Sequence, residues 1–184
     1  MKAVLAERYG PPEVLQIREI ATPSPKAEEI LIRIHATTVT SADWRLRSQT
    51  VPTGFGLIMR LVFGLRKPRQ PILGSELAGV VAAIGREVTR FQVGERVFAF
   101  SDMAMGCHAE YLCLPQDGMV VATPPALTDE TAAALCFGGT TALDFLRRAR
   151  VRPGERVLVN GASGAVGTAV VQLARRAGCP ATIR

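Results

Sequence analysis

The sequence is poor in aromatic side chains, which make up only 5% of its 184 residues. Lysine and arginine outnumber aspartate and glutamate by 22 to 16, and such an excess invites a nucleic-acid interpretation. Nucleic-acid modules interleave basic residues with aromatic side chains that stack on bases, and no such motif is present. We therefore expect no nucleic-acid partner, and we interpret the arginines between residues 147 and 156 as a solvated helix end and turn.

Long hydrophobic runs are also missing. No segment reaches the roughly 18 consecutive apolar residues of a membrane span, and the opening MKAVLAERYG lacks the apolar stretch and cleavage site of a signal peptide. We therefore expect a cytoplasmic protein without a membrane partner. Hydrophobic residues make up 48% of the chain and charged residues 21%, so most of it should bury a globular core.

Paired cysteines and histidine clusters, the usual signs of disulfides or metal sites, are absent as well. His35 and His108 stand alone, so we interpret both as structural. We expect four reduced thiols and no metal site, because the cysteines lack CxxC spacing. They are Cys107, Cys113, Cys136 and Cys179.

Short strands dominate the sequence from Lys2 to about Val121. Seven apolar or alternating segments predict them, separated by turn signals such as Gly10-Pro11-Pro12. The segments are residues 3–10, 14–20, 29–39, 77–85, 96–100, 108–114 and 119–122. This spacing predicts a barrel or sandwich-like β domain, which we place at residues 1–124.

Helix replaces strand at Thr128, which is followed by acidic residues and an alanine-rich run. Gly138 and Gly139 are expected to interrupt this helix before its period resumes. A short strand follows at residues 156–160, then a helix at residues 165–178 and the opening of another strand at residues 181–183. We assign residues 125–184 to a second domain.

The central motif is Gly161-Ala162-Ser163-Gly164-Ala165-Val166-Gly167, directly after the apolar strand and directly before the amphipathic helix. Strand, glycine turn and helix in this order suit the pyrophosphate of a dinucleotide. The middle glycine lets the backbone approach the phosphates, the last lets helix pack on strand, and the helix N-terminus supplies N–H donors. The alternative is an ordinary tight connection.

The second domain is expected to be truncated. A complete nucleotide domain of this kind has about six strands, and the sequence supplies one strand and the first residues of another. The residue that reads the ribose 2′ position lies at or beyond Arg184, which by its type could contact a 2′-phosphate. We expect residues 1–184 alone to bind NADPH only feebly.

Several separated segments together resemble the medium-chain dehydrogenase/reductase superfamily, in particular its zinc-independent quinone oxidoreductase branch. They are ATTVTSADWRLR, PILGSELAGVVAAIGREVTRFQVGERVFAF, HAEYLCLP, LTDETAAALCFGGTTALDFL and ERVLVNGASGAVGTAVVQLARRAG. The resemblance implies a β-rich GroES-like barrel domain followed by the first β-α unit of an incomplete α/β Rossmann domain. It also implies that substrate and nicotinamide meet between the domains.

The resemblance implies that zinc is absent. Zinc-dependent relatives have a cysteine and a histidine where this chain has Thr40 and Ser41, and a histidine where Ser75 precedes Glu76. Cys136 falls near the place of a further ligand, but one thiolate cannot hold catalytic zinc.

Without a Lewis acid, a quinone or an α,β-unsaturated carbonyl compound is the plausible substrate, because its developing charge spreads to an oxygen that donors can stabilise. The resemblance implies NADPH, preferred over NAD, as the hydride source. Candidate proton donors are Thr40, Ser41 and Arg45. Alternatively, the two hydroxyls satisfy a strand end.

By the same resemblance, Thr140 contacts the nicotinamide half of the cofactor, although it could equally be a helix N-cap. Asn160 is expected to orient the glycine turn. The candidate cofactor-binding residues are Thr140, Asn160, Gly161, Ala162, Ser163, Gly164, Ala165, Val166 and Gly167.

The segment from Pro52 to Pro71 combines apolar residues with four basic ones. A lid over the substrate is our first interpretation, and an oligomer contact or a membrane-surface patch are the others. A homo-oligomer is thus compatible with the sequence. Two functions rival the quinone or enone reductase: an enoyl-thioester reductase, and a truncated, non-catalytic module that binds a partner.

Overall fold

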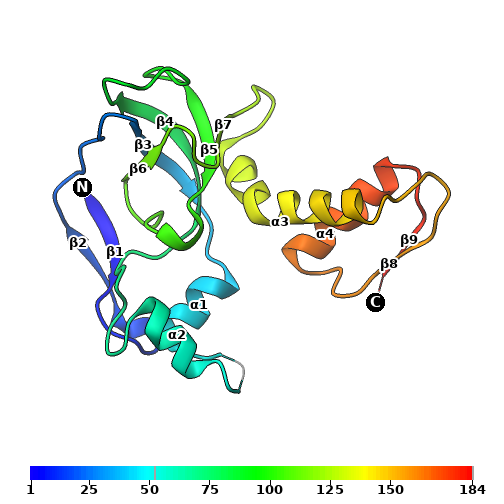
Figure 1. Ribbon diagram of the computed structural model, residues 1–184, viewed down its shortest axis with the longest axis horizontal. Helices are drawn as coiled ribbons and strands as arrows, with labels where there is room; N and C mark the ends of the chain where they lie inside the picture. The colour runs from blue at the N-terminus through cyan, green and yellow to red at the C-terminus, as the bar shows by residue number, and fades with distance from the viewer. Residues whose placement is uncertain (52, 184) are drawn as a thin grey trace. The chain divides into compact units, whose positions relative to one another are not determined.

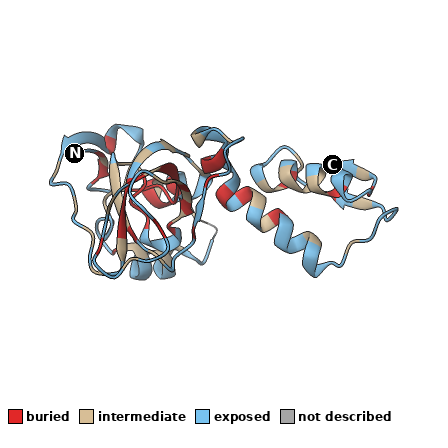
Figure 2. Cartoon of the chain, turned by 90° about the horizontal axis from the view of Figure 1, so that it is seen from above, coloured by how far each residue is buried: buried red, intermediate tan, exposed pale blue. Residues whose placement is uncertain are grey.

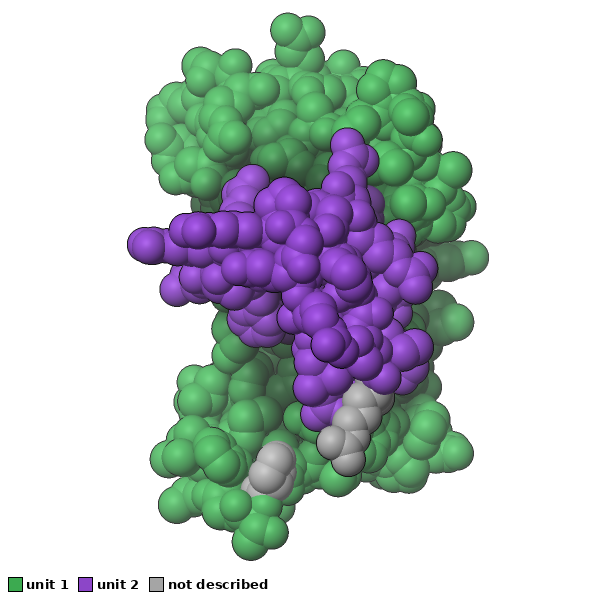
Figure 3. Space-filling model, turned by 90° about the vertical axis from the view of Figure 1, so that its right-hand side faces the viewer, with its two compact units in different colours: residues 1–133 green, residues 134–184 purple. Residues whose placement is uncertain are grey.

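The computed structural model describes residues 1–51 and 53–183, which form two compact units. They comprise Met1–Ala133 and Ala134–Arg184 and are coloured separately in Figure 3. Arg184, and with it the interpretation of a 2′-phosphate contact, lies outside the described residues. The division into domains after residue 124 stays a prediction.

The first unit is built on antiparallel strands, and each of the seven predicted strands is present among its described residues (Figure 1). Five strands form one sheet in the order β6-β3-β4-β5-β7, and β1 pairs with β2 in a hairpin. The strands are β1 (Lys2–Ala6), β2 (Leu15–Glu19), β3 (Glu29–Thr37), β4 (Glu76–Ile84), β5 (Arg96–Phe100), β6 (Tyr111–Pro115) and β7 (Val120–Ala122).

The barrel implied by the family resemblance is not closed within the described residues. A barrel needs continuous pairing around its circumference, whereas β6 and β7 lie at opposite edges of the sheet. The hairpin meets the rest of the unit through two isolated bridges, Ala3 with Ala109 and Leu5 with Ile72. The sheet is therefore open.

The core of the first unit lies on the central strands. Ile30 and Ile32 of β3, Leu77 and Val81 of β4, and Val97 of β5 have no measurable exposure. Burial of each such side chain stabilises the fold by about 1.5–3 kcal/mol. Figure 2 shows this core as red segments along the strands.

Two helices in the first unit were not predicted. They are α1 (Ser41–Ser48) and α2 (Gly56–Phe63), and two short 3₁₀ turns, η1 (Pro12–Val14) and η2 (Asp102–Ala104), accompany them. For α1 a signal existed, because Thr40 and Asp43 have the spacing of a capping box. The box is present: each residue's side chain accepts a hydrogen bond from the other's backbone amide.

Helix α3 (Asp129–Arg148) begins where the sequence predicted. The amide of Thr131 donates to Thr128 Oγ1 over 3.2 Å, which confirms Thr128 as an N-cap. The expected interruption at the two glycines was wrong, because α3 runs continuously through them. Gly138 lies so close to Ala165 that an added Cβ would stand 3.1 Å from its carbonyl carbon, so this glycine permits helix packing.

The second unit contains a parallel β-α-β arrangement, as expected from the sequence. It consists of β8 (Val157–Val159), α4 (Ala165–Arg176) and β9 (Ala181–Ile183), with β8 and β9 paired in parallel. No helix within the described ranges has both the length and the apolar character needed to cross a bilayer.

Candidate functional site

The glycine turn between β8 and α4 is closed by the backbone itself. The amide of Gly164 donates to the Gly161 carbonyl over 3.1 Å. Gly161 has a φ of 72°, in the left-handed region that side chains disfavour. The Thr168 hydroxyl donates to the Ala162 carbonyl over 3.0 Å and fastens the turn to the first turn of α4.

Two glycines of the turn have different surroundings. A Cβ on Gly167 would lie 2.2 Å from the Gly161 carbonyl oxygen, so the close approach of helix to turn requires glycine there. A Cβ on Gly164 would lie 3.5 Å from that same oxygen, an ordinary contact. The fold alone therefore does not require glycine at position 164, which leaves close approach of a ligand as the predicted reason for it.

The N-terminus of α4 carries hydrogen-bond donors that no acceptor of the described chain engages. Gly164 is the N-cap and cannot cap with a side chain, and no such bond is made. The first amide to find an acceptor within the helix is that of Thr168, which donates to the Gly164 carbonyl over 2.8 Å. Among the described residues, the amides of Ala165, Val166 and Gly167 thus have no acceptor, as is usual at the start of a helix.

The predicted polar side chains of the turn are accessible. Asn160, Ser163 and Gly164 are exposed, as is Ala165, whereas Ala162 and Val166 are half-buried and Gly167 is buried. Within the described ranges, neither the Asn160 amide group nor the Ser163 hydroxyl makes a hydrogen bond. Both side chains can therefore turn toward a ligand.

Thr140 lies in the middle of α3, so its alternative role as an N-cap was wrong. Its hydroxyl donates to the Cys136 carbonyl and lies 3.3 Å from that of Phe137. Such back-bonding is common for threonine within helices. A cofactor contact by Thr140 stays a prediction.

Thr40 caps α1, and its hydroxyl proton is already engaged. The hydroxyl donates to Asp43 Oδ2 over 2.8 Å, and the Thr40 amide donates to the same oxygen over 2.7 Å. Asp43 Oδ1 accepts a third bond, from the Gly74 amide, over 2.8 Å. Asp43 is buried and joins the start of α1 to the segment before β4. The Thr40 hydroxyl could donate to a substrate only if its hydrogen bond to Asp43 were broken.

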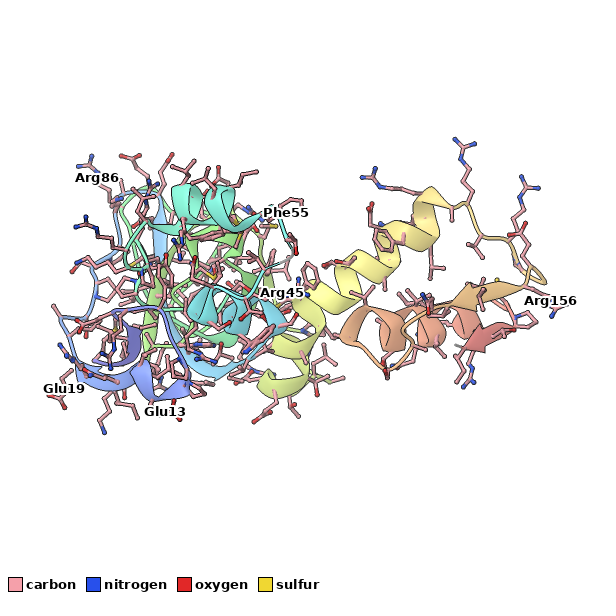
Figure 4. All side chains as sticks on the ribbon, turned by 90° about the horizontal axis from the view of Figure 1, so that it is seen from below. Glu13, Glu19, Arg45, Phe55, Arg86 and Arg156 are labelled. Carbon is pink, nitrogen blue, oxygen red and sulfur yellow. The ribbon has the colours of Figure 1, made fainter. Side chains whose placement is uncertain are left out.

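Ser41 and Arg45, by contrast, are exposed on α1. Their spacing of four residues puts both on the same face of the helix. Within the described part of the chain, neither side chain makes a hydrogen bond or ion pair, and Arg45 extends from α1 in Figure 4. The structure thus brings Ser41 and Arg45 together as available donors and sets Thr40 apart.

A partly buried polar network around Glu76 was not predicted. The Thr38 hydroxyl donates to the carboxylate of Glu76, and the Thr37 hydroxyl donates to the Glu76 carbonyl over 2.7 Å. His108 Nε2 donates to the Thr38 carbonyl over 2.9 Å, a contact that agrees with its structural interpretation. Isolated hydroxyl and acidic residues gave no sequence signal for this network.

The second histidine, His35, also has a structural partner. Its Nδ1 lies 2.8 Å from Asp129 Oδ2, and Arg96 Nη2 donates to Asp129 Oδ1 over 2.6 Å. Partial burial alone would raise the pKa of Asp129, but the hydrogen bonds and charges of Arg96 and His35 lower it below its ordinary value. These contacts fasten the first turn of α3 to the sheet.

All four cysteines are thiols rather than disulfides in the described part of the chain. Burial raises the pKa of Cys107 to about 12; a hydrogen bond with Ser101 opposes this shift, and the charges of Asp43 and Glu76 add to it. Burial also raises the pKa of Cys113 to about 11. Cys136 is buried, and no group of metal-binding residues gathers within the described ranges.

A cavity of about 270 Å³ lies in the first unit, beneath α2. Its lining is mainly apolar and includes Leu46, Phe63 and Met105. Tyr9 stands at its wall and donates to the Gly64 carbonyl over 2.8 Å. Burial raises the pKa of Tyr9, and the charges of Arg60 and Arg69 oppose that rise.

Comparison with known proteins places these features in a family. The model of the alcohol dehydrogenase GroES-like domain matches residues 26–125. Human quinone oxidoreductase is 39% identical over 181 residues, which are 97% of this chain and 50% of that protein. The chain thus spans about half the length of the relatives it matches.

Solved structures resemble the chain over its whole length. The Escherichia coli quinone oxidoreductase complexed with NADPH has a TM-score of 0.82 and 27% identity, covering 100% of this chain and 52% of that one. The CurK enoyl reductase has a TM-score of 0.85 and 26% identity, covering 99% of this chain and 53% of that one. The chain therefore belongs to the medium-chain dehydrogenase/reductase superfamily, in its quinone oxidoreductase branch, and carries the GroES-like domain of that family.

Proposed function

We propose that this chain supplies the substrate domain and the pyrophosphate loop of an NADPH-dependent oxidoreductase that reduces quinones or α,β-unsaturated carbonyl compounds. The observation that carries the proposal is the N-terminus of α4, where unpaired amides follow an exposed glycine turn. Such amides, with the positive end of the helix dipole, bind phosphate groups. The NADPH bound to the Escherichia coli relative supports this choice of ligand.

The β8-α4-β9 arrangement is, in this proposal, the start of a Rossmann domain. Parallel strands joined through a helix are its repeating element, and the first turn is where the pyrophosphate binds. Asn160 and Ser163 would orient or contact the diphosphate beside the amides. Thr140 would contact the nicotinamide half.

When bound, NADPH would supply the hydride. Hydride addition to a quinone or to the β-carbon of an enone moves negative charge onto the substrate oxygen, which then takes up a proton. Ser41 and Arg45 are suited to stabilise that oxygen, because their donors are exposed and unpaired on one face of α1. Thr40 would position them as the helix cap, or donate after leaving Asp43.

An enoyl-thioester reductase is the second candidate, and the likeness to the CurK enoyl reductase favours it. The same hydride transfer and the same donors would serve both substrates. The loss of NADPH absorbance with crotonyl-CoA and with simple quinones, measured on the protein to which this chain belongs, distinguishes the two candidates. Faster turnover of the thioester would assign the second.

The binding proposal is tested by amide chemical shifts of the isotope-labelled chain during an NADPH titration. We expect weak saturable binding with shifts concentrated at residues 161–167. Gly164→Thr should weaken it by about tenfold or more, because a side chain obstructs the phosphates and its hydroxyl occupies a helix amide. Ala177→Thr, at the opposite end of α4, is the matched control and should bind like the unchanged chain.

Two results would contradict the proposal. One is the absence of shifts in the glycine turn at millimolar NADPH. The other is equal binding by the Gly164→Thr and Ala177→Thr variants, which would mean that the ligand does not use this turn.

A further inference from the structure

The positive charge of the chain is concentrated in one segment. Residues 44–75 contain six lysine or arginine residues and no aspartate or glutamate. The whole chain has a formal charge of +6, so the remainder is balanced. The six are Arg45, Arg47, Arg60, Arg66, Lys67 and Arg69.

Four of these basic residues lie within α2 or in the segment directly after it. All four are exposed, and within the described ranges none forms an ion pair. They are Arg60, Arg66, Lys67 and Arg69. Their charge is therefore available to an anionic partner.

Helix α2 and its ends also expose large apolar side chains. Each is between 46% and 67% exposed, which is unusual for so many neighbouring residues. They are Phe55, Leu57, Ile58, Leu61, Val62 and Leu65. We call these six residues, together with the four basic ones, the α2 surface; Phe55 marks its start in Figure 4.

The helical period explains why the apolar side chains point outward. At 3.6 residues per turn, Leu57, Ile58, Leu61 and Val62 fall within an arc of about 140°. Met59 lies on the other side with Phe63, and both pack against the small core that includes Leu46 and Leu73. The outward arc is thus a convex apolar ridge, anchored to the unit by its opposite side.

The four residues of the ridge are each at least 46% exposed, so the ridge is open to an occupant from outside the first unit. A second copy of the chain is disfavoured as the occupant, because two surfaces carrying the same four positive charges repel. A protein partner would need a preformed apolar groove for the ridge. A bilayer offers soft hydrocarbon together with anionic headgroups, which suit both halves of the surface.

We propose that the α2 surface docks on anionic phospholipid bilayers, with α2 lying in the interface and its apolar ridge among the acyl chains. The four flanking cations contact the headgroups. This departs from the sequence expectation that the protein has no membrane partner. The docking is peripheral, because the eight residues of α2 are too few to span a bilayer.

The test is co-sedimentation of the full chain with vesicles of phosphatidylcholine alone or mixed with phosphatidylserine. We expect partitioning only onto the mixed vesicles, weakening as salt is added. The triple variant Arg66→Gln, Lys67→Gln, Arg69→Gln should bind about 100-fold less, since each basic residue near such a surface contributes about fivefold. The apolar variant Leu57→Gln, Leu61→Gln should also lose binding.

Matched controls carry equivalent changes elsewhere. Arg156→Gln, Arg175→Gln and Arg176→Gln together remove the same charge from exposed positions, and Ile17→Gln with Val93→Gln alters exposed apolar residues. Both controls should bind within about twofold of the unchanged chain. Circular dichroism verifies that each variant is folded.

Three outcomes would overturn the proposal: equal binding to neutral vesicles, full binding by the Leu57/Leu61 variant, or the same loss in the control with three arginines removed. A complete lack of partitioning also rejects it and leaves the α2 surface to a protein partner.

Discussion

Both units of the chain contain helices and strands, but they bury different side chains. The first unit buries isoleucine, leucine, valine and phenylalanine, among them Ile32 and Phe91. The second buries mainly small residues such as Ala142 and Ala174, while Phe145 and Leu158 remain exposed. Hydrogen-bonded elements can thus form in both units, but apolar burial stabilises chiefly the first.

The largest expected effect follows directly from this comparison. Ile32→Ala should lower the free energy of unfolding by about 2–5 kcal/mol, because it leaves a cavity in a closed core. Leu158→Ala in the second unit should change it by about 0.5 kcal/mol or less, since the side chain is already 67% exposed. Urea unfolding measures both, and equal effects would contradict the contrast between the units.

A smaller effect is expected within the second unit. Gly167→Ala should destabilise α4 by about 1–3 kcal/mol, because its Cβ collides with the Gly161 carbonyl. Gly164→Ser should be neutral or slightly stabilising, because its Cβ fits and its hydroxyl can cap the helix. Hydrogen exchange of the α4 amides separates the two variants, and similar exchange in both would refute the assigned roles.

The smallest effect compares the two ends of α3. Asp129→Asn should lower stability by about 1 kcal/mol at neutral pH, because it weakens the contacts with Arg96 and His35. The matched variant Asp144→Asn affects only an exposed pair with Arg148 and should cost less.

The pH dependence of this effect has a definite sign. Because the folded pKa of Asp129 lies below its unfolded value, its stabilising contribution is complete above about pH 4 and disappears as pH falls through the folded value. Urea unfolding at a series of pH values should therefore show the Asp129→Asn and unchanged curves converging in acid. A constant gap would contradict the assignment.

The strands of the first unit could be predicted because alternating or continuous apolar residues and turn residues mark them. Helix α1 was missed because the apolar residues in its short sequence, SADWRLRS, do not recur at helical spacing. The capping box that begins at Thr40 was the available signal for it. Helix α2 was missed because its ridge faces solvent, and the sequence pattern does not show which side of an apolar helix is covered. The open sheet could not be predicted, because whether two edge strands pair depends on residues that are far apart in the sequence.

The glycine turn of the candidate site was predicted as a local feature, and its geometry follows from the sequence order of strand, glycine and helix. Asp43 and Glu76 could not be predicted, because their partners come from distant segments. The contact between Gly138 and Ala165 accounts for a glycine within α3, and no local pattern reveals a contact between such distant segments.

The raised pKa values of Cys107 and Cys113 lower the reactivity of these two thiols toward electrophiles. Enones and quinones alkylate proteins at thiolates, and a thiol reacts only to the extent that it is ionised. Two side chains with pKa values of about 12 and about 11 remain almost wholly protonated at neutral pH. A protein that handles such electrophiles would therefore keep these two sulfur atoms unmodified while exposed to its own substrate.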